Sequence, residues 1–156
     1  MKVLLSGAIV ALLLAAAPPD PVEWKLSEGP VRSLKAGARF TVKLAGKVQP
    51  GWHMYSMKPL AGGPVPTRIW INDAQPFLLA GAVRADAPML AQDPSFNMEV
   101  ETYEGEASFL LPLRVAGDVE PGSQVLPVNV SYQACNNKIC LPPKTAKVTL
   151  AIDITR

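Results

Sequence analysis

Two cysteines, Cys135 and Cys140, are the residues of this chain whose spacing points most directly to chemistry. With four residues between them the thiols can pair only around a tight turn, and Asn136 and Asn137 favour turn formation. A disulfide there closes a loop of six residues and stabilises the fold by only about 2 kcal/mol on chain-entropy grounds. A bridge between distant strands would stabilise more, so the spacing favours a functional disulfide, although local hairpin disulfides also occur as structural features.

The chemistry expected of this pair is thiol–disulfide exchange. A thiolate attacks a disulfide sulfur, so one cysteine must be reachable and the other must lie close enough to resolve the mixed disulfide. Cys135 and Cys140 are the predicted catalytic pair, and spacing alone does not say which of them forms the mixed disulfide. No cofactor and no metal ion is predicted for this reaction.

Residues 1–17 are predicted to be a secretory signal peptide. Lys2 precedes an apolar run, residues 3–14, and three alanines follow at 15–17. The run has about twelve residues, whereas a helix needs about 20 to span a bilayer. We therefore expect cleavage near Ala17 and export to the periplasm, where an oxidising environment favours disulfides. No later segment is long and apolar enough to insert into a membrane.

Residues 18–156 are expected to form one domain. A domain of about 139 residues buries roughly two-thirds of the surface of its unfolded chain, which is enough for a core without disulfides. Fifteen basic and thirteen acidic residues are interleaved along the chain, without a basic run. Since nucleic-acid binding relies on clustered basic residues, nucleic acid is not an expected partner.

Short strands are predicted along the whole domain, because sixteen prolines and eleven glycines separate segments in which apolar and polar residues alternate. Phe40, Val42 and Leu44 face one way and the polar residues between them face the other. Further strands are expected at 52–56, 68–71, 77–83, 100–103, 107–115, 125–132 and 147–154, with long loops at 59–66 and 85–94. Many short strands without an amphipathic helix predict an all-β, immunoglobulin-like β-sandwich.

His53, Tyr55 and Phe96 are further candidates for the site. His53 and Tyr55 are two positions apart on a predicted strand, so their side chains leave the same face. On its own, a single histidine is more typical of a surface or hydrogen-bonded core position than of a functional site. Phe96 lies in a loop with Pro94 and Asn97, where it could cover a site or make a minor core contact. Core rather than site positions are expected for Trp24, Trp52 and Trp70.

Three segments carry a pattern beyond the cysteine spacing. In residues 131–143 a Tyr-Gln-Ala-Cys stretch leads to Cys-Leu-Pro-Pro, and residues 51–56 are Gly-Trp-His-Met-Tyr-Ser. Residues 96–109 combine an aromatic in a loop with a following strand. In this order, over nearly the whole mature chain, the segments resemble the N-terminal periplasmic domain family of the thiol:disulfide interchange protein DsbD. The counterparts in that family are Tyr-Gln-x-Cys before Cys-x-Pro-Pro, a Gly-x-x-x-Tyr segment, and a cap loop.

This resemblance implies an immunoglobulin-like sandwich with a surface disulfide that a cap loop shields and a membrane partner re-reduces. Cys140 would be the accessible attacker and Cys135 the resolving thiol. His53 would move a proton and Tyr55 would donate a hydrogen bond to a sulfur, while Phe96 would cover the disulfide.

The function that the resemblance implies is periplasmic thiol–disulfide exchange. The cysteine pair would relay electrons between a membrane-embedded donor and periplasmic thioredoxin-fold partners, as a protein-disulfide reductase or in cytochrome c biogenesis.

Two features depart from the family pattern. The acidic residue that the family places two positions before the cap aromatic falls at Pro94 here, with Asp93 one position further from Phe96. An acidic contribution to proton handling is therefore not expected at the family's position. The chain also ends at Arg156, without the transmembrane and thioredoxin-like parts of the full-length protein, so the donor is expected to be a separate polypeptide.

Two other classes of function stay open. A copper-binding module is suggested by the methionines 54, 57 and 98 with His53 and the cysteines, because soft sulfur ligands and imidazole suit Cu(I). On a strand, however, Met54 should point away from His53. The other class is a non-catalytic interaction domain whose disulfide is structural.

Overall fold

A computed structural model describes residues 20–29, 33–73 and 76–156. The predicted signal peptide, residues 1–17, lies outside these ranges. Within them the regular structure consists of β-strands, and no residue is helical. None of the described residues forms a helix with the length and hydrophobicity needed to cross a bilayer.

The strands of the described ranges are grouped into three sheets, whose orders are β1-β3-β10-β6 with β7 also on β10, β2-β13-β11-β5, and β12-β4-β9-β8. All pairs are antiparallel except β2 with β13. The bounds are β1 Val22–Glu28, β2 Leu34–Lys35, β3 Arg39–Val48, β4 His53–Tyr55, β5 Arg68–Trp70, β6 Phe77–Leu79, β7 Arg84–Ala85, β8 Met89–Asp93, β9 Met98–Tyr103, β10 Glu106–Val115, β11 Gly122–Tyr132, β12 Ala134–Cys135 and β13 Lys144–Thr155.

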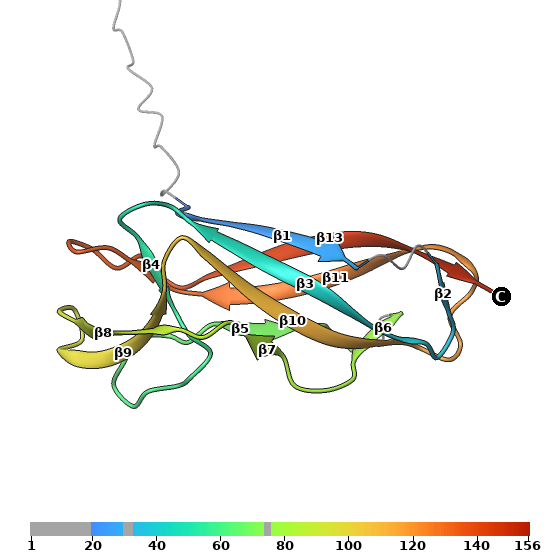
Figure 1. The fold of residues 1–156 in the computed structure, drawn as a ribbon, viewed down its shortest axis with the longest axis horizontal. Coiled ribbons are helices and arrows are strands. Elements are labelled where there is room, and N and C mark those ends of the chain that lie inside the picture. The colour runs from blue at the N-terminus through green and yellow to red at the C-terminus, as the bar shows by residue number, and fades with distance from the viewer. Residues whose placement is uncertain (1–19, 30–32, 74–75) are drawn as a thin grey trace, which may run out of the picture.

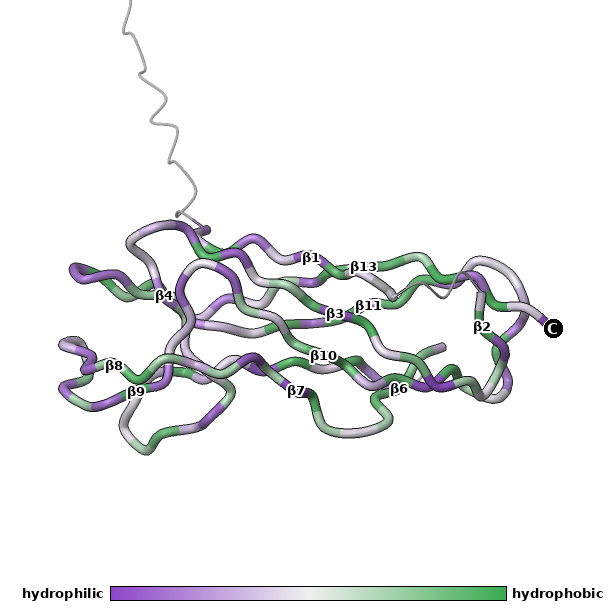
Figure 2. The backbone as a smooth tube through the Cα atoms, viewed as in Figure 1, coloured by the Kyte–Doolittle hydropathy of each residue, from purple (hydrophilic) through white to green (hydrophobic). Residues whose placement is uncertain are grey.

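The first two sheets pack face to face around one apolar core. In the first sheet Leu44 pairs with Phe109 and Val42 with Leu111, and all four are fully buried. Every second residue of β11 from 126 to 130 is buried on the facing sheet. Hydrophobic and hydrophilic residues alternate along these long strands (Figure 2), as expected where one face of a sheet packs on a core and the other meets water.

Trp24 ties the edge strand β1 into this sandwich. It pairs with Gly46 of β3, where an added Cβ would come within 2.8 Å of the indole. The absence of a side chain at Gly46 therefore lets the indole lie against the strand. The Trp24 ring also meets Phe109, with ring centroids 6.0 Å apart, and Tyr132 of β11, with centroids 5.3 Å apart. One indole thus contacts strands of both layers.

The third sheet extends one end of the sandwich. β9 continues into β10 after two residues, and β12 follows β11 after Gln133, so this sheet is attached to both layers. Figure 1 shows the turn between β8 and β9 and the hairpin after β12 projecting at the same end, opposite the C-terminus. The strands of the sandwich therefore hold these two turns on one side of the molecule.

Most predicted strands are confirmed. The two-residue strands β2 and β7 were not predicted, and three larger differences are found. The predicted strand 77–83 ends at Leu79, the last residue of β6 in register with β10. Residues 85–94, predicted as a loop, contain β8, an edge strand in which positions 89–92 are all exposed, so no alternation marks it. β1 was not predicted, because the prolines at 18, 19 and 21 directly before it suggest a leader and not a strand.

Phe109→Ala should lower the free energy of unfolding by about 3–5 kcal/mol, because it leaves a cavity beside Trp24 and Leu44 in a fully buried position. Leu110→Ala is the matched control, since the neighbouring side chain is 38% exposed and should change stability by less than about 1 kcal/mol. Denaturant unfolding measures both. Equal losses for the two variants would contradict the inward and outward assignment of β10.

Candidate redox site at the Cys135–Cys140 disulfide

A disulfide joins Cys135 to Cys140 and closes the hairpin that follows β12. Within it, the side-chain oxygen of Asn136 accepts hydrogen bonds from the backbone amides of Lys138 and Ile139, at 2.8 and 2.9 Å. The Asn136 amide donates in turn to the Ile139 carbonyl at 2.9 Å. These bonds form the tight turn predicted from the asparagines, and they hold the cysteines opposite each other.

The two cysteines differ in exposure. Cys135 lies in β12, pairs with His53 of β4 and is fully buried. Cys140 begins the return of the hairpin and is partly exposed. Of the pair, Cys140 is therefore the more exposed residue.

The base of this hairpin is fastened by Asp20. Tyr132 and Lys144 are the last partners of β11 and β13 before the hairpin. The Tyr132 hydroxyl donates to Asp20 Oδ1 at 2.8 Å, and Lys144 forms an ion pair with the other oxygen. Burial alone would raise the pKa of Asp20, but these two partners outweigh it and lower the pKa. Asp20 thus stays charged and joins both strands of the hairpin base.

A histidine, a tyrosine and an aspartate lie beside Cys140. His53 and Tyr55 leave the same face of β4, with ring centroids 5.3 Å apart in an edge-to-face arrangement. The Tyr55 hydroxyl donates a 2.6 Å hydrogen bond to Asp93 Oδ2 and lies 3.9 Å from the Cys140 sulfur. His53 Nε2 is 3.3 Å from the Tyr55 hydroxyl oxygen and 3.4 Å from Asp93 Oδ2. The three polar side chains and the sulfur form one continuous network.

Asp93 is buried and nevertheless favours its charged form. Burial by itself raises the pKa of a carboxyl, but hydrogen bonds from Tyr55, Ser95 and Phe96 outweigh it. With the nearby His53, they lower the pKa of Asp93 below its ordinary value. Burial, and then the bond to this carboxylate, raise the pKa of Tyr55. At neutral pH the network therefore contains a carboxylate and a hydroxyl that keeps its proton.

Residues 94–97, which we call the cap loop, connect β8 to β9. Asp93 Oδ1 accepts hydrogen bonds from the amides of Ser95, at 2.7 Å, and Phe96, at 3.3 Å. Asn97 has a φ of 52°, a left-handed conformation that asparagine adopts more readily than most residues. The Phe96 ring then meets Tyr55 edge to face, with ring centroids 6.0 Å apart. The cap loop is thus held next to the disulfide by a side chain of the site itself.

An apolar cluster, which we call the disulfide cluster, surrounds the sulfurs and is separate from the sandwich core. Its buried members are Tyr55, Val100 and Cys135, and its partly buried members are Leu60, Phe96, Met98 and Cys140.

The structure brings all the residues predicted from the sequence to one place, namely Cys135, Cys140, His53, Tyr55 and Phe96. Their roles in catalysis stay predictions.

Asp93 and Leu60 belong to the site and were not predicted. The family's spacing placed the acidic position at Pro94, but the carboxylate that reaches the site is one residue earlier, at the end of β8. An aspartate followed by a proline and a serine is a typical start of a side-chain-capped turn, and this signal could have identified Asp93. Leu60 carries no comparable signal, because its loop has no regular pattern.

The candidate copper ligands do not converge. Met54 is buried in the sandwich core, on the opposite side of β4 from His53, and Met57 packs against the same core. Met98 lies in the disulfide cluster. In the described ranges no group of three or more His, Cys, Asp or Glu side chains is placed to hold a metal ion.

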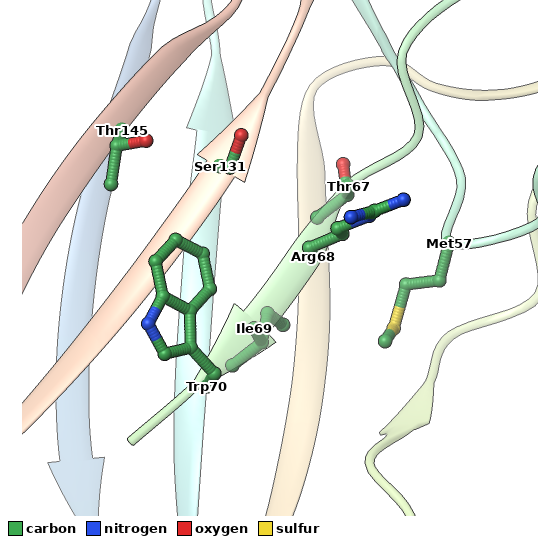
Figure 3. Close-up of a pocket in the computed structure, with 7 residues that line it drawn as sticks. All are labelled: Met57, Thr67, Arg68, Ile69, Trp70, Ser131 and Thr145. Atoms are coloured by element: carbon green, nitrogen blue, oxygen red, sulfur yellow. The ribbon is translucent and has the colours of Figure 1, made fainter. Parts of the chain in front are cut away.

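A surface hollow of about 590 Å³ lies on the second sheet and contains neither cysteine. Figure 3 shows Trp70 and Arg68 on β5 at this hollow, with Ser131 of β11 nearby. The prediction that Trp70 is a core residue is wrong, because Ile69 takes the inward position of β5 and Trp70 stands on the outer face. The other two tryptophans pack against the core as predicted.

Comparison with known proteins identifies a matching family and several related structures, two of which follow. The family described as thiol:disulfide interchange protein DsbD, N-terminal, matches residues 26–152. The N-terminal domain of DsbD from Neisseria meningitidis, in the reduced form, is 17% identical with a TM-score of 0.51, over 76% of this chain and 79% of that one. The N-terminal periplasmic domain of ScsB from Proteus mirabilis is 16% identical with a TM-score of 0.51, over 90% of this chain and 49% of that one. No curated protein sequence matches significantly.

These similarities confirm the predicted immunoglobulin-like β-sandwich. At such low identity the two solved structures bear on the fold and not on the roles of individual residues. The chain spans about half the length of the ScsB structure.

Phe96→Ala should leave the free energy of unfolding within about 1 kcal/mol of the wild type, because the residue lies in a partly exposed loop. Reduction of the disulfide by dithiothreitol should become about fivefold faster, since exchange rates depend on access to the sulfur. Leu90→Ala, which removes an exposed side chain from the same hairpin, is the control and should change neither quantity. A loss of about 3 kcal/mol or more would identify Phe96 as a core residue, and an unchanged rate would exclude shielding.

Acidification should open the cap loop. Because the pKa of Asp93 is lowered, its contribution to stability is complete above the ordinary carboxyl value of about 4 and is lost as the pH falls through the lowered value. Reduction by a phosphine, which needs no thiolate, should therefore accelerate in this acidic range while the circular dichroism stays native.

Asp93→Asn should be reduced faster already at neutral pH and should show little acceleration in acid. Asp86→Asn is the control. The Asp86 carboxylate also accepts a hydrogen bond from a backbone amide, that of Ser108, but it lies outside the network of His53, Tyr55 and Asp93. A parallel pH profile in wild type and Asp93→Asn would contradict the role of Asp93.

Proposed function

The chain belongs to the family of N-terminal domains of the thiol:disulfide interchange protein DsbD, and on this basis we propose that it is a periplasmic thiol–disulfide exchange protein. Its Cys135–Cys140 pair relays electrons from a membrane-embedded dithiol donor to periplasmic partners of thioredoxin fold. The proposed activity is that of a protein-disulfide reductase component without a cofactor.

The observation that carries this proposal is the unequal exposure of the two cysteines. Exchange requires a nucleophile to reach one sulfur while the other sulfur leaves. Cys140 is partly exposed and Cys135 is fully buried. This difference supports Cys140 as the residue that forms the mixed disulfide, both with the electron donor and with the electron acceptor. A purely structural bridge has no need of a polar network at its more exposed cysteine, whereas here the Tyr55 hydroxyl lies 3.9 Å from the Cys140 sulfur.

Reduction of the chain then proceeds in two displacements. A donor thiolate attacks the Cys140 sulfur, a bond forms between them, and Cys135 leaves as a thiolate that takes up a proton. The second donor thiolate attacks the donor sulfur of the mixed disulfide, so the donor becomes a disulfide and Cys140 is released. Two electrons and two protons have passed to the chain. In the reverse sense, the Cys140 thiolate attacks an acceptor disulfide and Cys135 resolves the intermediate.

The polar network is suited to the charge that appears on Cys140. Tyr55 keeps its single proton, which it donates to Asp93 in the oxidised chain, and after reduction the hydroxyl can turn this hydrogen bond to the Cys140 thiolate. His53 Nε2 lies 3.3 Å from the Tyr55 hydroxyl oxygen and 3.4 Å from Asp93 Oδ2, so this imidazole can pass a proton to or from the network. Asp93 orients Tyr55 through the 2.6 Å hydrogen bond. Phe96 covers the sulfurs until a partner displaces it.

Location and partners are inferred from the leader and the family. The sequence predicts export through residues 1–17. The related domain of ScsB is periplasmic. Because the periplasm is kept oxidising, the electrons for reduction must come from the other side of the membrane.

The test is a pair of single-cysteine variants. Cys135→Ser keeps the exposed Cys140, and Cys140→Ser keeps the buried Cys135. We expect an aromatic disulfide reagent to label the first variant at least about tenfold faster than the second, because access limits exchange. Loss of the bridge should cost only about 2 kcal/mol, so both variants should give native circular dichroism.

The same variants identify the partners. Expressed in the native host, Cys135→Ser should accumulate mixed disulfides with a membrane protein and with thioredoxin-fold proteins, while Cys140→Ser should not. If Cys140→Ser traps partners and Cys135→Ser does not, the assignment of the attacking residue is wrong. If neither traps a protein, the bridge is structural.

A further inference from the structure

A second loop, separate from the cap loop, contributes a side chain to the disulfide cluster. Residues 56–67, which we call the β4–β5 loop, contain Leu60. Leu60 packs in the disulfide cluster together with Met98 and Cys140. The disulfide cluster thus receives Phe96 from the cap loop and Leu60 from the β4–β5 loop.

Both ends of the β4–β5 loop are fixed by hydrogen bonds of the buried residues Ser56 and Thr67. The Ser56 amide and hydroxyl donate to the carbonyl and the carboxylate of Glu101, each at 2.9 Å. The Thr67 hydroxyl donates to the Tyr55 carbonyl at 2.6 Å, and its amide to the Ser56 carbonyl at 3.0 Å. Ser56 and Thr67 are both buried, so water competes little for these bonds.

The middle of the loop is fixed as well. The Val65 amide donates to the side-chain oxygen of Gln133 at 2.9 Å, and the Gln133 amide group donates to a carbonyl of the cysteine hairpin at 3.2 Å. At Gly63 an added Cβ would lie 3.0 Å from both the Leu60 Cβ and the Met98 sulfur. The loop therefore sits tightly on Met98 and is bound to the hairpin that carries the cysteines.

The cap loop is attached differently. Its amides at Ser95 and Phe96 bind one side chain, that of Asp93. We infer that Leu60 is a specificity-determining residue, forming with Met98 a fixed wall on one side of the disulfide while the cap loop is the movable side. Protein partners reach the Cys140 sulfur by displacing Phe96, and Leu60 keeps small thiols out. This inference rests on the proposed exchange function.

The physical basis is a difference in binding energy between reductants. A protein partner has surface with which to replace the contacts of Phe96, so it can move the cap loop. A small thiol has none, and it meets both covers in place. Shortening the fixed wall opens a path that only a small molecule can use.

The test compares two reductants on the full chain, dithiothreitol and a reduced thioredoxin-fold protein. Leu60→Ala should raise the rate with dithiothreitol about fivefold and leave the rate with the protein dithiol within about twofold, because only small-molecule access changes. Val65→Ala removes a partly exposed side chain from the same loop and keeps the amide bonded to Gln133. It should change neither rate. Phe96→Ala should accelerate both reductants.

Two further variants keep the test decisive if Leu60→Ala does not fold. Gly63→Ala pushes against Leu60 and Met98 and should also raise the dithiothreitol rate. If Leu60→Ala loses its native circular dichroism, Leu60→Val and Gly63→Ala decide the result. Unchanged dithiothreitol rates in natively folded variants, or equal acceleration with both reductants, overturn the inference. If the wild type fails to react with any protein dithiol, the proposed function fails, while the dithiothreitol rates still decide whether Leu60 shields the disulfide.

Discussion

The carboxylate of Asp93 is the interaction on which the arrangement of the site depends. One oxygen holds the two cap-loop amides and the other holds the Tyr55 hydroxyl. A buried charge is tolerated only when its hydrogen-bonding capacity is met, so the carboxylate favours this whole set of contacts together. The position of Phe96, the orientation of Tyr55 and the environment of Cys140 therefore depend on one another.

The sandwich supplies the rigid support for this arrangement. β4, which carries His53 and Tyr55, is a three-residue strand that could not hold its shape alone. It is held between β12 and β9, and these strands continue into the long strands β11 and β10 of the two layers. The site residues thus stand on elements whose geometry the sandwich core fixes, while the parts that must move for exchange lie in turns.

Sequence patterns predicted the strands and much of the site, for identifiable reasons. Alternation reveals a strand with one buried face, and the two-residue spacing of His53 and Tyr55 fixes a shared face wherever the strand lies. β8 was not predicted, because an edge strand whose positions are nearly all exposed shows no alternation of apolar and polar residues. Asp93 was not predicted as a site residue, because it lies three positions before Phe96, one more than in the family pattern. Leu60 was not predicted, because the contacts of an irregular loop produce no periodic pattern in the sequence.

The disulfide cluster and the sandwich core share no buried residue. Regions with separate packing can open independently, with free energies well below that of global unfolding. Amide hydrogens of the cap loop and the cysteine hairpin should then exchange with solvent through local opening, while those of β3 and β10 should exchange only through global unfolding. The same separation lets substitutions at this end alter partner choice or reactivity with little effect on the foldedness of the domain, so the site can diverge while the scaffold is retained.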